Sequence, residues 1–260
     1  MTRAMVLRGI AAQALASVLA CSLPAAAMVG GAQPASDGAG RATVMLTGSH
    51  GTFCSGVALA RDLVLTAGHC VLPGTDYKLV ELDAARPPAL KDLTTIVRHP
   101  EFDVTAVLRH RVTADVALVK LAAPRQIVPA MLAPAGGAVA AGDRFVVAGY
   151  GLATRGDGRT GGTVRAATLV ATGTPGSLQI RLADPATKGE RAGLGACTGD
   201  SGAPVYRDIG GALAVIGVVS WSTGPGNSEG CGGLTGVTPL TRYRGWIVEQ
   251  AGKLGSALAP

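Results

Sequence analysis

A serine flanked by glycines and preceded by an aspartate is the segment of this chain best suited to covalent chemistry. It lies in residues 197–204, which read CTGDSGAP, with Ser201 as the hydroxyl residue. A serine hydroxyl is a weak nucleophile at neutral pH and needs both a base and a place where negative charge can accumulate. Glycine lets backbone N–H groups approach a substrate carbonyl closely. By itself the segment is equally compatible with an ordinary Gly/Asp/Ser turn.

A candidate base and a candidate orienting acid lie upstream of the serine. His69 ends the segment LTAGH, and histidine is the side chain whose unperturbed pKa lies nearest neutrality. Asp115 opens the apolar segment DVALVKL, where a half-buried carboxylate can orient an imidazole. The chain order His, Asp, Ser differs from that of subtilisin-like enzymes and of α/β-hydrolases. The Gly-x-Ser-x-Gly elbow of the hydrolases is also absent, because Ala203 stands at its last glycine position.

These three segments together resemble the signature motifs of the chymotrypsin/trypsin family of secreted serine endopeptidases. TAGHC resembles the family's Thr-Ala-Ala-His-Cys, DVAL its Asp-Ile-Ala-Leu, and GDSGAP its Gly-Asp-Ser-Gly-Gly-Pro. Gly68 and Ala203 are the two small substitutions, and both leave the reactive groups in place. The resemblance begins at about Met28 and covers nearly all of the chain that follows.

The resemblance implies an all-β, chymotrypsin-like fold. It consists of two perpendicular six-stranded Greek-key β-barrels with a C-terminal helix, and the site lies between the barrels. The expected organisation is a signal peptide at 1–27 and a serine protease domain at 28–260. The two barrels are expected at roughly 28–133 and 134–240.

Length and composition agree with this architecture. The 260 residues are 48% hydrophobic, enough for a sizeable core, and the 38 glycines and 15 prolines are typical of many short strands joined by tight turns. Aromatic residues make up only 3% of the chain, so the core is expected to consist of Ala, Val and Leu. Residues 243–250 resemble the family's C-terminal helix, with Trp246 and Ile247 expected to pack inward.

The resemblance also implies a role for each reactive residue. His69 would accept the proton of Ser201, and Asp115 would orient the imidazole. The N–H groups of Gly199 and Ser201 would form the oxyanion hole. No metal or organic cofactor is required, and the expected partner is a protein or peptide substrate bound by a monomer.

The first 27 residues have the pattern of an export signal. A basic start precedes a mainly apolar stretch at 10–23, and residues 25–27 offer a small-residue cleavage site, with cleavage expected after Ala27. The apolar stretch is shorter than the roughly 20 residues of a membrane span. A lipoprotein signal ending at Cys21 is a second alternative. We expect a secreted or periplasmic protein of bacterial type, although a eukaryotic secretory leader has a similar pattern.

Cleavage after Ala27 would expose Met-Val-Gly-Gly, which resembles the Ile-Val-Gly-Gly start of activated family members. In the family the new α-ammonium pairs with the aspartate before the nucleophile, so the resemblance pairs Met28 with Asp200. That ion pair would hold the oxyanion N–H groups in position, and signal peptidase itself would produce the competent protein. The alternative is that Gly30 and Gly31 merely begin a loop.

The cysteines fit an oxidising compartment. The chain has 5, and removal of Cys21 with the leader leaves an even number, which allows three pairings. A metal site is the competing interpretation, but the chain has no Cys-x-x-Cys or His-Glu-x-x-His motif. The family resemblance implies the pairs Cys54–Cys70, behind the histidine, and Cys197–Cys231, beside the serine loop.

The segments expected to bind substrate favour an uncharged side chain before the scissile bond, at P1. Gly195 stands where the family has its pocket base, so no acidic group is present there to favour Lys or Arg. Ser222 replaces a glycine on the pocket wall. We therefore expect aliphatic or aromatic P1 residues. The substrate-binding residues implied by the resemblance are Gly195, Ala196, Thr198, Ser220, Trp221, Ser222 and Gly236. Ser220 is also expected to support the catalytic aspartate.

Charge and the remaining histidines add little. The net charge of +6 is mild, and the chain lacks the clustered Lys and Arg and the interleaved aromatic residues of a nucleic-acid binder. His99 lies in a segment that resembles a family surface loop, and His50 and His110 have no identifiable partner, so none of the three is expected to be a ligand.

Three functions remain: an endopeptidase, a non-catalytic relative that uses the scaffold for binding, and an esterase. The intact reactive positions favour the first.

Overall fold

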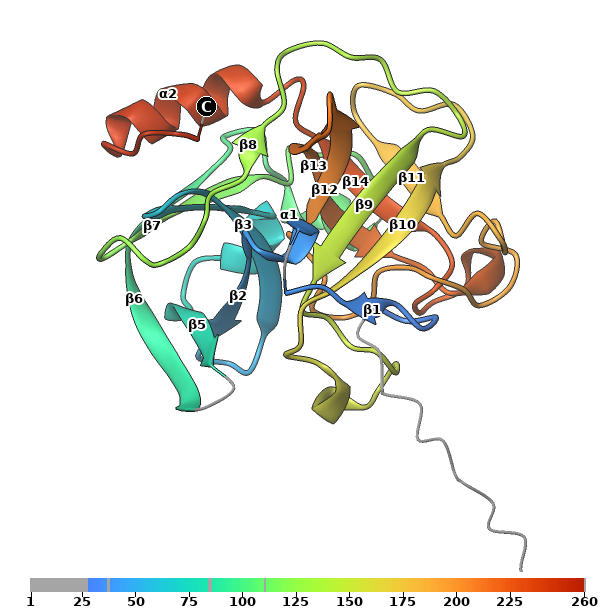
Figure 1. Ribbon diagram of the computed structural model, residues 1–260, viewed down its shortest axis with the longest axis horizontal. Helices are drawn as coiled ribbons and strands as arrows, with labels where there is room; N and C mark the ends of the chain where they lie inside the picture. Colours follow the sequence, from blue (N-terminus) through green and yellow to red (C-terminus); the bar gives the residue numbers. More distant parts are fainter. Residues whose placement is uncertain (1–27, 37, 84–85, 110, 260) are drawn as a thin grey trace, which may run out of the picture.

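The protein consists mainly of short β-strands arranged in two bodies that lie side by side (Figure 1). The computed structural model describes residues 28–36, 38–83, 86–109 and 111–259. The expected leader, with Cys21 and the cleavage site after Ala27, lies outside these residues.

The first body is a closed antiparallel barrel of six strands in the order β2-β3-β4-β7-β6-β5. The ring closes where β2 pairs with β5. Its strands are β2 (Thr43–Gly48), β3 (Phe53–Ala60), β4 (Leu63–Thr66), β5 (Tyr77–Asp83), β6 (Arg86–Arg98) and β7 (Ala117–Leu121).

The second body is a ring of six antiparallel strands in the order β9-β10-β11-β14-β13-β12, which closes because β9 pairs with both β10 and β12. Two short strands attach to it: β1 (Gln33–Pro34) to β10, and β8 (Met131–Leu132) to β13. The two barrels confirm the predicted fold. The strands of the ring are β9 (Arg144–Gly149), β10 (Arg165–Ala171), β11 (Ile180–Ala183), β12 (Pro204–Ile209), β13 (Ala212–Ser222) and β14 (Thr235–Pro239).

Helices are few and short. The predicted C-terminal helix is present as α2 (Arg244–Lys253), and it lies against the first barrel although it follows the last strand of the second (Figure 1). Ile247 is buried as expected, and Trp246 is partly buried. No helix among the described residues is long and apolar enough to cross a membrane. The other helical segments are α1 (Val104–Leu108) and the 3-10 turns η1 (Gly38–Gly40), η2 (Gly68–Val71), η3 (Gly158–Thr160) and η4 (Pro225–Asn227).

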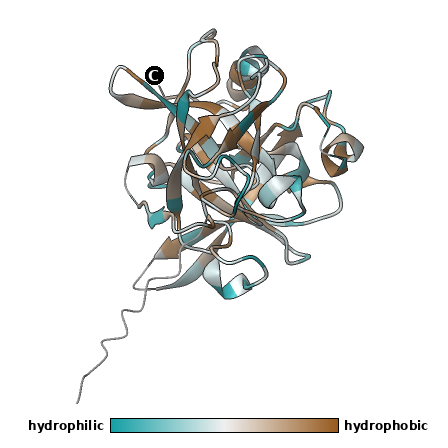
Figure 2. Ribbon diagram, turned by 90° about the vertical axis from the view of Figure 1, so that its right-hand side faces the viewer, coloured by the Kyte–Doolittle hydropathy of each residue, from teal (hydrophilic) through white to brown (hydrophobic). Residues whose placement is uncertain are grey.

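Apolar patterning explains which segments form strands. In β10 the side chains of RAATLVA alternate between buried and half-buried, as expected when successive residues point to opposite faces. In β3 and β4 nearly every residue is buried, and small residues such as Ala, Gly and Ser fill the tighter places. Figure 2 shows hydrophobic residues concentrated on the strands and hydrophilic residues on several outer loops.

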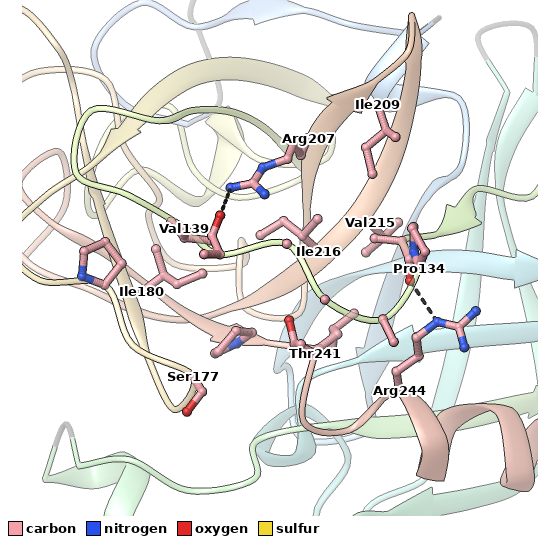
Figure 3. Close-up of a pocket in the computed structure, with 18 of the residues that line it drawn as sticks. Pro134, Val139, Ser177, Ile180, Arg207, Ile209, Val215, Ile216, Thr241 and Arg244 are labelled. Atoms are coloured by element: carbon pink, nitrogen blue, oxygen red, sulfur yellow. Dashed lines mark hydrogen bonds between the residues drawn. The ribbon is translucent and has the colours of Figure 1, made fainter.

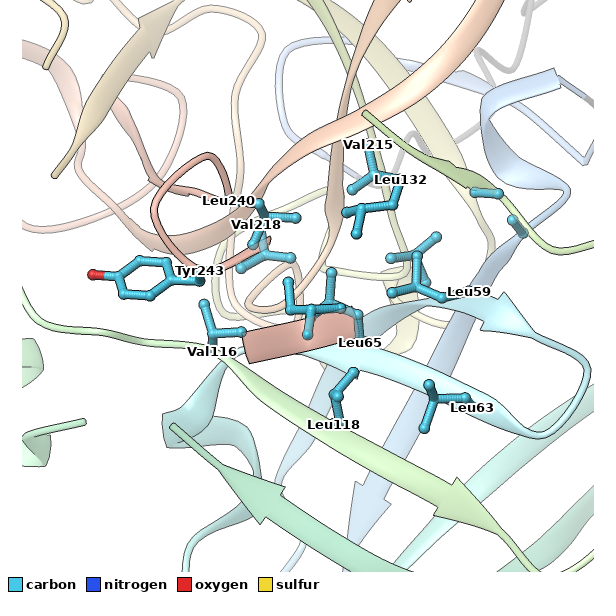
Figure 4. Close-up of a cluster of buried hydrophobic side chains, with 14 of the residues drawn as sticks. Leu59, Leu63, Leu65, Val116, Leu118, Leu132, Val215, Val218, Leu240 and Tyr243 are labelled. Atoms are coloured by element: carbon cyan, nitrogen blue, oxygen red, sulfur yellow. The ribbon is translucent and has the colours of Figure 1, made fainter. Parts of the chain in front are cut away.

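One buried cluster joins the two barrels. Leucines and valines from β3, β4 and the start of β7 meet side chains from β8, β13 and the chain leading into α2 (Figure 4). A fully buried Val or Leu stabilises a fold by about 1.5–3 kcal/mol, so this cluster fixes the barrels relative to each other. The labelled members are Leu59, Leu63, Leu65, Val116, Leu118, Leu132, Val215, Val218, Leu240 and Tyr243.

Candidate active site

His69 and Asp115 form a close pair at the edge of the first barrel. His69 lies in η2, directly after β4, and Asp115 lies just before β7, and β4 and β7 are paired neighbours. The Nδ1 atom of His69 lies 2.8 Å from Oδ2 of Asp115, and the backbone N–H of His69 donates to Oδ1 at 2.9 Å. The two contacts fix both the position of the imidazole and its tilt.

Asp115 is completely buried. Its place at the opening of a strand had indicated only partial burial. A buried carboxylate is tolerated only when hydrogen-bond donors surround it. Besides the two His69 groups, Ser220 in β13 donates its hydroxyl to Oδ2 at 2.5 Å. With Nδ1 facing the carboxylate, the proton of a neutral imidazole belongs on Nδ1, which leaves Nε2 free to accept another.

Ser201 lies in the tight loop that enters β12. Gly199 and Gly202 on either side have positive φ angles of 93° and 79°, which glycine adopts without strain. A Cβ atom on Gly202 would also lie 2.1 Å from the Thr66 hydroxyl, so the loop packs directly on the end of β4. The backbone N–H of Ser55, in β3, donates to the Ser201 carbonyl at 2.8 Å.

The structure brings His69 and Ser201 into one cavity of about 620 Å³ between the barrels. Within the described residues their side chains form no hydrogen bond with each other, and Nε2 of His69 lies 3.9 Å from Sγ of Cys70. Nucleophile–base hydrogen bonds are often long or absent without substrate and tighten only in the complex. His69, Asp115 and Ser201 therefore meet at one site, although they are far apart in the sequence. The His69 and Ser201 side chains must approach each other before a proton can pass between them.

Ser55 is a contributor that sequence analysis missed. It is completely buried, its hydroxyl donates to the Gly199 carbonyl at 2.9 Å, and it accepts from the N–H of Tyr150 at 2.9 Å. It thus ties the serine loop to β3 on one side and to the end of β9 on the other. The signal was a hydroxyl residue within an otherwise apolar strand, where an unpaired polar group is costly.

Asp200, beside the nucleophile, is also completely buried. Its carboxylate accepts from the N–H groups of Gly151 and Cys197, both at 2.9 Å, and has no cationic partner among the described residues. Burial raises the pKa of Asp200 to about 7, although the two backbone hydrogen bonds oppose the shift. Gly149 and Gly151 leave room for this carboxylate, since a Cβ on either would lie within 2.4 Å of it.

The segment that begins at Met28 enters the same region. Met28 is buried, and Val29 forms an isolated β-bridge with Gly195, five residues before Asp200. A Cβ on Gly30 would lie 2.3 Å from the Gly193 carbonyl carbon, so Gly30 also packs tightly. In the full-length chain the Met28 nitrogen is a peptide amide, so an ion pair with Asp200 requires hydrolysis after Ala27.

Both disulfides implied by the family resemblance are present. Cys54 joins Cys70, with Cα atoms 6.0 Å apart, and Cys197 joins Cys231, with Cα atoms 4.8 Å apart. The first anchors the histidine turn to β3, and the second anchors the serine loop to the opposite wall. The grouping of Cys54, His69 and Cys70 lacks the thiolates that a metal would need, because both sulfurs are committed to the disulfide.

The predicted substrate-binding residues divide into two groups. Ala196, Thr198, Trp221 and Ser222 line the active-site cavity. Three others do not line it in the described part of the chain. Ser220 is directed to Asp115, and Gly236 is covered by the ring of Trp221. The third, Gly195, has its Cβ position 3.1 Å from Gly232.

The cavity has a second wall that sequence analysis did not identify. Its lining includes an apolar stretch next to the Cys54–Cys70 disulfide and a charged rim where Arg155 Nη1 donates to the Glu229 carbonyl at 3.0 Å. Those residues come from segments far apart in the sequence, and no local pattern marks them. They are Phe53, Leu72, Pro73, Tyr77, Arg155 and Glu229.

Of the remaining histidines, neither His50 nor His99 lines this cavity. His50 is exposed and lies 3.1 Å from the Thr75 hydroxyl, and His110 lies outside the described residues. The segment of His99 had indicated a surface loop, but the ring of His99 is partly covered. It packs edge-on against Tyr243 and Trp246, at centroid distances of 4.9 and 5.0 Å. Burial lowers the pKa of His99 and so favours its neutral form. The neutral ring packs against the start of α2.

A second cavity, of about 560 Å³, lies between the segment 133–139, β12 to β14 and the start of α2 (Figure 3). Arg207 and Arg244 donate to the carbonyls of Ala138 and Ala133, at 3.2 and 2.9 Å, and so hold that segment over it. Among the residues that the structure describes, the lining contains Ser177 but no histidine, cysteine or carboxylate. It therefore lacks the base that an acyl-transfer site needs.

Comparisons with known proteins identify the family of the chain. The model of the family described as Trypsin matches residues 29–247. A vitellin-degrading protease from Bombyx mori is 28% identical over 224 residues, which cover 80% of this chain and 79% of that protein. With the family match spanning both barrels, the chain belongs to the trypsin family.

Proposed function

We propose that the protein is a secreted serine endopeptidase that hydrolyses peptide bonds through an acyl-enzyme on Ser201. The observation that carries this proposal is the His69–Asp115 pair, which opens onto the same cavity as the Ser201 hydroxyl. Membership of the trypsin family and the likeness to a protein named for degrading vitellin support a protein substrate.

The reaction follows from the groups at the site. Nε2 of His69 takes the Ser201 hydroxyl proton while Oγ bonds to the scissile carbonyl carbon. The N–H groups of Gly199 and Ser201 stabilise the resulting oxyanion, each by roughly 3–4 kcal/mol in comparable sites. The imidazolium, stabilised by Asp115, then protonates the leaving amine. Water repeats the sequence and frees Ser201.

Activation would depend on the N-terminus. Removal of residues 1–27 would convert the Met28 nitrogen to an ammonium. The partner it would meet is the buried carboxylate of Asp200, which has no cationic partner in the part of the chain that the structure describes. The Val29–Gly195 bridge already brings the segment to this region. Sequencing of the exported protein would test the idea, since any start other than Met28 contradicts it. Export and its bacterial route are inferred from the leader alone.

We infer an uncharged P1 preference. Among the described residues, the one carboxylate in the lining of the cavity is Glu229, whose exposed side chain lies near Arg155. A buried Lys or Arg of the substrate would thus lack a partner. Preferential cleavage after Lys or Arg over Leu or Ala would contradict this.

Hydrolysis of a denatured protein and of a peptide library separates the endopeptidase from an esterase and from a non-catalytic relative. Protein starting at Met28 is expected to cleave internal peptide bonds, and Ser201→Ala is expected to abolish cleavage. Ser177→Ala, an exposed serine in the second cavity, is the matched control and should cleave like wild type. Turnover of esters alone, or equal activity in Ser201→Ala, would overturn the proposal.

A further inference from the structure

The indole of Trp221 lies where the wall of a side-chain pocket was expected. Trp221 and Gly236 are directly paired on β13 and β14. A Cβ atom built on Gly236 would lie 2.0 Å from Cε2 and 2.4 Å from Cδ2 of the indole. The ring is therefore pressed against the backbone of Gly236, and no substrate atom can enter between them.

The strand geometry explains this position. The pairing of β13 with β14 shifts register between Val219 and Trp221, so a bulge surrounds Ser220. Bulges redirect the side chains that flank them. Here Ser220 is directed to Asp115, and the next side chain, that of Trp221, lies against Gly236 of β14; Trp221 also lines the active-site cavity.

The indole is also held in place. Its Nε1 atom is buried, and the β13 pairing continues past it to Ser222, which donates to the Gly230 carbonyl at 3.2 Å. An aromatic ring that covers a cross-strand glycine packs a large apolar area, which displacement would return to water. On the side of Gly236, the cavity next to Ser201 therefore ends at the Trp221 indole and does not extend to the glycine backbone.

We propose that Trp221 is a specificity-determining residue whose indole ends the P1 pocket and restricts it to small uncharged side chains such as Ala and Ser. This inference rests on the proposed function and narrows it, because aromatic and large aliphatic P1 residues would overlap the ring. Thr198 and Ser222 line the same cavity.

Tetrapeptide p-nitroanilides that differ only at P1 test the inference. For wild type, kcat/KM with Ala is expected to exceed that with Phe by about 100-fold, a discrimination within the range of a pocket of fixed size. Trp221→Ala should raise kcat/KM for the Phe substrate at least about tenfold relative to Ala. Trp221→Phe should fall between them, and Trp246→Phe, at the other tryptophan, should keep the wild-type ratio.

Two further measurements keep the outcomes separable. Titration with a small fluorophosphate counts competent Ser201 in each variant, so misfolding of Trp221→Ala is not mistaken for altered preference. Binding of free indole, followed by calorimetry, needs no catalysis: Trp221→Ala is expected to bind it and wild type is not. An unreactive wild type would refute the proposed function, and the indole measurement would still decide the role of Trp221. Wild-type cleavage after Phe as efficient as after Ala, or indole binding equal in both proteins, would overturn the inference.

Discussion

The hydroxyl of Ser55 donates to the carbonyl oxygen of Gly199 at 2.9 Å and thereby links a strand of the first barrel to the nucleophile loop of the second. The Ser55 hydroxyl oxygen in turn accepts from the N–H of Tyr150. The loop that must present two N–H groups to an oxyanion is thus braced from the barrel that carries the histidine.

Replacement of Ser55 by Ala is expected to lower kcat about tenfold with little change in KM, since the Gly199 peptide loses its brace. The free energy of unfolding should fall by about 1–3 kcal/mol, because two buried backbone groups lose their partner. Thr43→Val removes a comparable buried hydroxyl, bonded to the Ala39 carbonyl, away from the site. Kinetics and chemical denaturation of both variants check this. Equal kcat in the two would show that Ser55 has no positioning role.

Asp115→Asn is expected to reduce kcat by about 10⁴-fold, the size found when a triad carboxylate is neutralised and the imidazole adopts the wrong tautomer. Ser220→Ala should lower kcat by about 10- to 150-fold, since hydrogen bonds to charged groups contribute about 1.5–3 kcal/mol and the carboxylate keeps both His69 contacts. Asp208→Asn, at an exposed aspartate, serves as the control. Steady-state kinetics should rank the variants in this order; a loss in Ser220→Ala as large as in Asp115→Asn would contradict it.

The pH dependence of stability should report the state of the N-terminus. Where Met28 remains acylated, the pKa of Asp200 is about 7 in the folded protein against an ordinary value near 3.8. The folded state then binds the proton more tightly, so the free energy of unfolding falls as pH rises from about 4 to 7. The slope from this group approaches about 1.4 kcal/mol per pH unit.

A protein that starts at a free Met28 should lack this loss, because its ammonium would stabilise the charged carboxylate. Its stability should instead decline at higher pH, where the ammonium deprotonates. Denaturation of the two forms across pH 4–9 makes the comparison, and Asp200→Asn should remove the difference between them. Identical pH profiles for the free and Nα-acetylated proteins would exclude the ion pair.

Sequence analysis predicted the parts of this molecule that depend on chain order and local chemistry. The two barrels, α2 and both disulfides were implied by the family resemblance, which rests on motifs whose residue types and order are distinctive. The same resemblance implied the contact of His69 with Asp115, and the structure explains that contact by the pairing of β4 with β7.

What it could not predict depends on side-chain direction. Because of the bulge at Ser220, the side chain of Ser220 contacts Asp115 and that of Trp221 contacts Gly236. The alternation of polar and apolar residues along a strand does not predict such a bulge. Ser55 forms its bonds to loops more than 90 residues away along the chain. His99 meets two aromatic rings only because α2 crosses to the first barrel.

The most direct test of the account is the site of a covalent adduct. A small fluorophosphate, reacted with protein that starts at Met28 and mapped by mass spectrometry, should add one group per chain, on Ser201. The rate should collapse in His69→Ala and remain unchanged in His50→Ala, at an exposed histidine. An adduct on another residue, or labelling that does not depend on His69, would contradict the proposed catalytic role of these two side chains.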